Sequence, residues 1–61
     1  MLDHCTYDKV KLLHELSCIV WFIEKHAKID AKNDGDTEFA NIVKKLAPDL
    51  EKYIDQLYEL L

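Results

Sequence analysis

His14 and Cys18 are the side chains whose types and spacing come closest to a chemical site in this sequence. Residues four apart on a helix lie on the same face, so both side chains could bind one metal ion. Zinc needs four protein ligands, or three and a water molecule. One chain supplies two, and a second chain would have to supply the others. A metal-stapled dimer using His14 and Cys18 is therefore one alternative. For a single chain, we expect no metal site and no cofactor.

The polar segment DAKNDGDTEFAN, residues 30–41, resembles an EF-hand calcium loop at three positions. Asp30, Asp34 and Gly35 match the first, fifth and sixth positions of that loop. Lys32 and Asn41 stand where the loop needs an oxygen ligand and a bidentate Glu. Because a lysine ammonium repels calcium, we predict a polar turn instead of an ion site.

Catalysis has little support in the sequence. A cysteine–histidine pair can act as nucleophile and base, but a cysteine in the middle of a helix is normally an inert packing residue. A chain of 61 residues is also too short to enclose a deep substrate pocket alone. We therefore expect no enzymatic activity and no small-molecule substrate.

Two long helices must position these side chains. Along the first, apolar residues recur at spacings of three and four: Leu13, Leu16, Val20, Ile23 and Ala27. This period predicts a helix over about residues 4–29. Asp3 or Thr6 could be its N-cap, and the earlier start at Asp3 is favoured. Residues 30–36 hold the only glycine and are predicted to form the turn. Asp36 or Thr37 then caps a second helix over about residues 37–60.

The second helix carries an apolar stripe that is predicted to form its core face. Its members alternate at spacings of four and three: Phe39, Val43, Leu46, Leu50, Tyr53, Leu57 and Leu60. Pro48 lies on the solvent side of the stripe, and a proline inside a helix removes a hydrogen bond, so we predict one helix kinked at Pro48. The alternative is a break there, with the last segment folded back as a third helix. The sequence thus predicts an all-α fold, an antiparallel helical hairpin forming one domain over residues 1–61.

Composition narrows the classes of function. The chain is 49% hydrophobic and 33% charged, as expected for a folded helical protein. Its net charge is −4 and its basic residues are scattered lysines, which disfavours nucleic-acid binding; a nucleic-acid-binding hairpin dimer is kept as an alternative. Cys5 and Cys18 lie too far apart on one helix to bridge within a chain, which indicates a reducing compartment. With no visible signal peptide or membrane span, we expect a cytoplasmic protein without membrane contact.

The stretch LSCIVWFI, residues 16–23, is apolar on nearly every side of the first helix. A two-helix hairpin buries one side of that helix and leaves Cys18, Trp21 and Phe22 on another. Exposed aromatic patches usually mark interfaces. We therefore expect these residues, with His14 and Lys25 beside them, to pair two chains into a four-helix bundle homodimer. In plan this resembles other dimers of helical hairpins.

The predicted function is a small non-enzymatic protein–protein interaction or regulatory module that self-associates through the first helix. A chain this short gains stability from a second copy of itself, because its own core is marginal. Two alternatives stay open. In one, a third helix covers Trp21 and Phe22 within a monomer. In the other, the patch is kept for a different protein partner.

Overall fold

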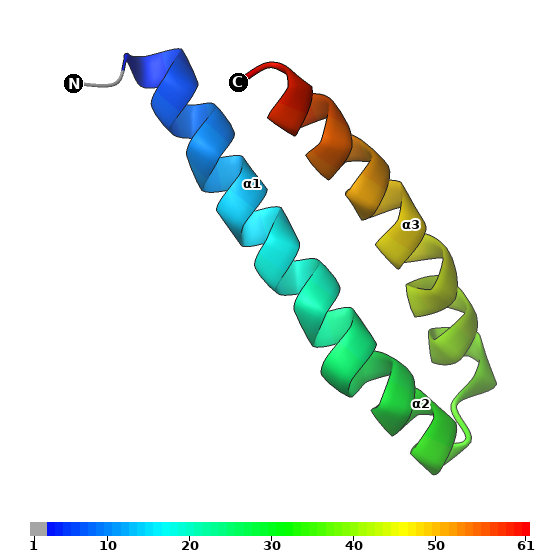
Figure 1. Ribbon diagram of the computed structural model, residues 1–61. Coiled ribbons are helices and arrows are strands. Elements are labelled where there is room, and N and C mark those ends of the chain that lie inside the picture. Colours follow the sequence, from blue (N-terminus) through cyan, green and yellow to red (C-terminus); the bar gives the residue numbers. More distant parts are fainter. Residues whose placement is uncertain (1–2) are drawn as a thin grey trace.

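A computed structural model describes residues 3–61, which form two long helical arms lying antiparallel (Figure 1). The first arm is continuous. It consists of α1 over His4–Phe22, a π-helical turn over Ile23–Ala27, and α2 over Lys28–Asp34. The second arm is α3, over Thr37–Glu59. The predicted all-α fold with two antiparallel helices is therefore confirmed. Within residues 3–61, no helix has the length and apolarity to cross a membrane.

Both arms begin at an aspartate that caps its helix. The Asp3 carboxylate accepts a hydrogen bond of 2.7 Å from the Thr6 backbone N–H. The Asp36 carboxylate accepts one of 3.1 Å from the Phe39 backbone N–H. Each bond satisfies a backbone donor that has no partner inside the first turn. The predicted start at Asp3 is confirmed, and of the two candidates for the second helix, Asp36 is the cap.

The turn between the arms is shorter than the predicted segment 30–36. Residues 30–34 are helical, and the connection consists of Gly35 and Asp36 alone. Ala31, which is 2% exposed, extends the packing between the arms and so favours the longer helix. Gly35 ends the helix at φ 70°, and the Asp36 N–H donates to the Ala31 carbonyl over 2.9 Å. The calcium-like spacing of Asp30 and Asp34 therefore lies along a helix, not along an open loop.

α3 runs without a break through Pro48 to Glu59. Pro48 is exposed, so its ring faces solvent and not the first arm. The alternative with a third helix folded back over Trp21 and Phe22 is therefore not the observed fold. The kink at Pro48 stays a prediction.

The core is a narrow seam between the arms. Ile23 and Ala27 pack with Val43 and Ala47, and Leu50 lies against this cluster. The stripe predicted for the first helix is confirmed, because all its members are buried or half-buried. The stripe predicted for the second helix is split, because Val43 is buried while four members are exposed: Phe39, Leu46, Tyr53 and Leu60. The most buried residue of α3 is Ala47, whose small side chain lets the arms approach closely.

We expect Gly35→Ala to destabilise the hairpin by about 1 kcal/mol, because φ 70° strains any residue with a Cβ. No atom lies within 4 Å of the Cβ that would be added, so the cost comes from the backbone alone. Gly35→Asn is the matched control, since Asn adopts this conformation more readily. Urea unfolding followed by circular dichroism measures both variants. Equal stability of Gly35→Ala and the parent chain would contradict the prediction.

We expect the first turn of α1 to loosen in acid. The hydrogen bond from the Thr6 backbone N–H favours the ionised carboxylate and lowers the pKa of Asp3 below its usual 3.8. Since the pKa is lower in the folded state, the cap stabilises the helix above the unfolded value and loses this effect as pH falls through the folded value. Hydrogen exchange at the Thr6 amide, measured against pH, should show this loss below about pH 4. Asp3→Asn keeps an uncharged cap, so its profile should lack that step.

Candidate interaction surface

The π-helical turn Ile23–Ala27 sets which side chains of the first arm face α3. The Lys28 N–H bonds to the Ile23 carbonyl five residues earlier, so this turn holds one residue more than an α-helical turn. The buried positions of the first arm therefore continue from Ile23 to Ala27 and Ala31 in steps of four. A regular α-helix would instead have turned Asp30 toward α3. The extra residue thus keeps a carboxylate out of the seam.

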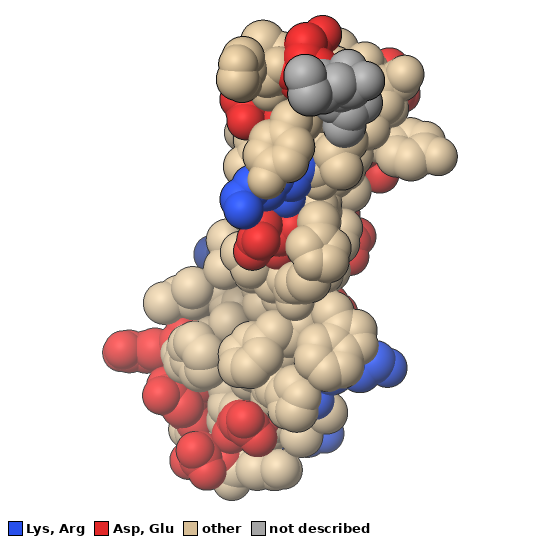
Figure 2. Space-filling model, turned by 90° about the vertical axis from the view of Figure 1, so that its left-hand side faces the viewer, with Lys and Arg blue, Asp and Glu red and all other residues tan. Residues whose placement is uncertain are grey.

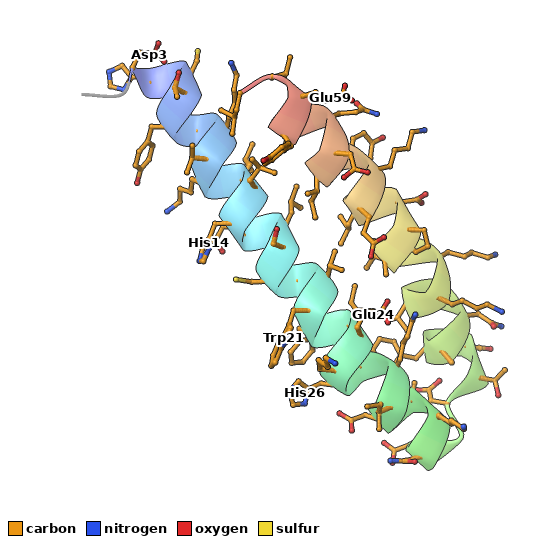
Figure 3. All side chains as sticks on the ribbon, in the orientation of Figure 1. Asp3, His14, Trp21, Glu24, His26 and Glu59 are labelled. Atoms are coloured by element: carbon orange, nitrogen blue, oxygen red, sulfur yellow. The ribbon has the colours of Figure 1, made fainter. Side chains whose placement is uncertain are left out.

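The same turn builds an aromatic ridge on the outer side of the first arm. The His26 ring is stacked on Phe22 and meets Trp21 edge-on, with ring centroids 5.4 Å apart in both pairs. Trp21 and His26 are five residues apart, a spacing that the widened turn brings onto one face. Figure 3 shows Trp21 and His26 on the side of the arm away from α3. We call Trp21, Phe22 and His26 the aromatic ridge.

His14 continues this outer side toward the N-terminus (Figure 3). The Cys18 Sγ lies 3.7 Å from the His14 Nε2, so the predicted pair is brought together. Both residues are exposed, and Cys5 and Cys18 are free thiols, as their separation predicts. The described residues contain no group of three His, Cys, Asp or Glu side chains that could hold a metal ion. The pair is therefore a two-ligand site at most within one chain.

All five residues predicted for the interface are exposed: His14, Cys18, Trp21, Phe22 and Lys25. Trp21 and Phe22 are each 56% exposed, a large fraction for aromatic side chains. His26 is not among the predicted residues, although it follows Phe22 by four residues and shares its face even in a regular α-helix. The steps of four between Ile23, Ala27 and Ala31 were the available signal for an inserted residue.

Charged side chains border the outer side of the first arm without covering it. Figure 2 looks onto this side, where uncharged surface occupies the middle of the view and acidic groups gather at its lower left. Near the aromatic ridge, the Lys28 ammonium and the Glu24 carboxylate form an ion pair at 2.9 Å. Both members are partly exposed, so this pair contributes little to stability.

A second apolar surface lies along one edge of the seam, and its residues on α3 are ones that the sequence predicts for the core face of the second helix. Its five large side chains are between 40% and 56% exposed: Leu12, Ile19, Phe39, Leu46 and Tyr53. Each of them directly precedes a residue of the seam. We call these five residues the flank row. It contains residues of both arms, whereas the aromatic ridge belongs to one arm.

An open depression of about 300 Å³ adjoins the flank row at Leu12. Asp8, Lys11 and Glu15 complete its lining. These four residues are spaced i, i+3, i+4 and i+7, which is the four-residue hole that receives one side chain from a neighbouring helix. The depression therefore has the geometry of a helix-packing site.

Comparison of the chain with protein-family models, curated proteins and solved structures gives no match. A functional proposal must therefore rest on the two apolar surfaces described above. The aromatic ridge contains Trp21 and Phe22, and the flank row contains Phe39 and Tyr53, which are of the aromatic types enriched in the centres of protein interfaces. Their chemistry fits contact with another protein surface.

Deleting Lys25 should leave the hairpin folded, with an unfolding free energy within about 1 kcal/mol of the parent chain. The deletion removes the additional residue of the π-turn, so a regular α-helix replaces it and the following residues rotate only slightly. Deleting Glu15 is the control, because it lies in regular α-helix and rotates its neighbours by about 100°. That rotation takes Leu13 out of the seam and should unfold the chain. Urea unfolding compares the two deletions, and equal damage from both would contradict the assignment of the π-turn.

Proposed function

We propose that this protein is a small, non-enzymatic protein–protein interaction module that works as a homodimer. Two hairpins pair into a four-helix bundle, and each covers apolar side chains that the other leaves in water. The aromatic residues Trp21 and Phe22, with His14, Cys18 and Lys25, are the surface that the sequence predicts for this pairing. The flank row is the surface that the packing of the two arms adds.

The excess of exposed surface carries this proposal. The chain exposes 5095 Å². A folded monomer of its mass, 7.2 kDa, is expected to expose about 4,100 Å². The surplus of about 1,000 Å² on each of two chains amounts to about 2,000 Å² of buried area in a dimer. That area matches the upper end of the standard range for specific interfaces.

The small core supports the same conclusion. Within residues 3–61, the buried hydrophobic residues are Ile23, Ala27, Ala31, Val43 and Ala47, of which three are alanines. The radius of gyration is 14.2 Å, against about 10.5 Å expected for a compact chain of this length. A second hairpin would cover the flanks of this narrow seam. Pairing therefore supplies the hydrophobic burial that one hairpin lacks.

The separation of His14 and Cys18 favours a metal-stapled form as a second candidate. Zinc bonds of about 2.3 Å to sulfur and about 2.0 Å to nitrogen place the two atoms about 3.5 Å apart in a tetrahedron. The observed 3.7 Å between Sγ and Nε2 fits one ion. This candidate requires the two outer sides to face each other, so that each chain gives two ligands. Zinc should then raise the melting temperature, and Cys18→Ser should abolish that rise.

Light scattering after size exclusion tests the homodimer directly. We expect a mass of about 14 kDa, twice the chain mass of 7.2 kDa, over a range of concentrations. The mass should persist when salt is raised, because apolar association is not screened, whereas contacts to phosphate weaken steeply. A mass near that of one chain at every concentration would refute the proposal.

A further inference from the structure

We infer that the second copy packs on the flank row, Leu12, Ile19, Phe39, Leu46 and Tyr53, and leaves the aromatic ridge on the outside of the dimer. This inference rests on the proposed homodimer and assigns the surface through which it forms. It differs from the surface expected from the sequence, which lies on the outer side of the first arm.

Helical register places the flank row on one face of the hairpin. Leu12 and Ile19 precede the seam residues Leu13 and Val20, so both lie on the same side of the first arm. The row has three members on α3, which are spaced by seven residues: Phe39, Leu46 and Tyr53. Each of them directly precedes an alanine or an isoleucine of the seam. In an antiparallel pair of helices, positions that precede the seam residues at this register face the same side. The row therefore spans both arms as one surface.

The opposite flank has different chemistry. In the middle of the hairpin it carries the exposed polar residues Ser17 and Glu24 on the first arm, and Lys44 and Glu51 on α3. A helix that packs in a bundle has apolar residues at the seam and on one adjacent flank, with polar residues elsewhere. Both arms follow this pattern, and they do so on the same side. One face of the hairpin is thus apolar enough to pack against two more helices.

The dimensions of the molecule favour this face over the ridge. The hairpin extends over 47 × 17 × 12 Å, so the faces that span both arms are its broadest. An area of 47 by 17 Å is about 800 Å², which is the surface that each partner gives to a standard interface. The aromatic ridge lies on the narrow outer side of one arm and would bring together two single helices. Only the broad face provides an area comparable to the surplus of about 1,000 Å² of exposed surface on each chain.

The depression at Leu12 adds a receiving site to the flank row. Its lining residues Asp8, Lys11, Leu12 and Glu15 form one hole of the kind that interlocks helices. In a symmetric dimer each chain offers this hole and receives a side chain from its partner. Leu12 belongs to both the hole and the row, so the two features form one continuous surface.

The emission of Trp21 tests this assignment without any substitution. Trp21 is the only tryptophan, and it lies on the outer side, away from the flank row. With the flank row as interface, its emission stays that of a water-exposed indole while the dimer is diluted to the monomer. With the ridge as interface, the dimer emits at shorter wavelength and the emission moves to longer wavelength on dilution. The second result would overturn the inference and leave the homodimer intact.

Matched substitutions on the two surfaces give an independent test. Leu46→Gln and Tyr53→Gln should each raise the dimer dissociation constant at least about 100-fold, because a symmetric interface loses the side chain twice. Trp21→Gln, on the outer side of the first arm, should change it by no more than about threefold. Sedimentation equilibrium measures the constants, and circular dichroism at the same concentrations reports whether each variant is folded. If a variant has lost its helices, the Trp21 emission of the parent chain decides between the flank row and the aromatic ridge as the interface.

The outcomes separate this inference from the proposal beneath it. A monomer at all concentrations refutes both. A dimer that dissociates with Trp21→Gln, but not with the flank variants, supports the homodimer and refutes the flank row. Zinc provides a further check, because flank pairing keeps the His14–Cys18 pairs of the two chains apart. A zinc-dependent rise in dimer affinity that Cys18→Ser removes would also overturn the inference.

Discussion

The close approach of the two arms over small residues is the constraint on which the rest of the structure depends. Ala27, Ala31 and Ala47 are among the most buried residues of the chain. Alanine side chains let two helices come close together, but each removes little apolar surface from water. The larger side chains of the flank row lie beside this seam and remain at its edge. The alanines of the seam therefore account both for the thin core and for the apolar flank beside it.

The π-turn adapts the first arm to this seam. Because the buried residues there are spaced by four, a regular α-helix would carry Asp30 toward α3 and rotate Ala31 away. The additional residue in Ile23–Ala27 corrects the register and at the same time brings His26 against Trp21 and Phe22. The packing of the seam and the shape of the outer surface are thus coupled through five residues. A regular α-helix of unchanged length would alter both.

Much of the fold follows from sequence patterns that act over short distances. The first core stripe, the cap at Asp3 and a second helix continuing through Pro48 each depend on neighbours within one or two turns. The missed features depend on contacts between the arms. Packing of Ala31 against α3 keeps residues 30–34 helical. In the seam, Ala47 is buried and its neighbour Leu46 is exposed. Period alone gives these two adjacent residues equal weight, since both lie on the broad apolar stripe. Exposure of Trp21 and Phe22 was predictable because the first helix has more apolar sides than one neighbour can cover.

In the proposed dimer, folding of this hairpin with its thin seam is coupled to association. When two chains bury their surfaces together, the stability of the folded state includes the free energy of pairing and rises with protein concentration. The net charge of −4 on each chain opposes uncontrolled aggregation of the apolar surfaces, while a close fit between two identical faces still overcomes that repulsion. Pairing through one broad face also buries that face in both copies. Because an isologous interface is closed, no third chain can bind there. The proposed dimer is therefore a finite particle with both aromatic ridges on its outer sides.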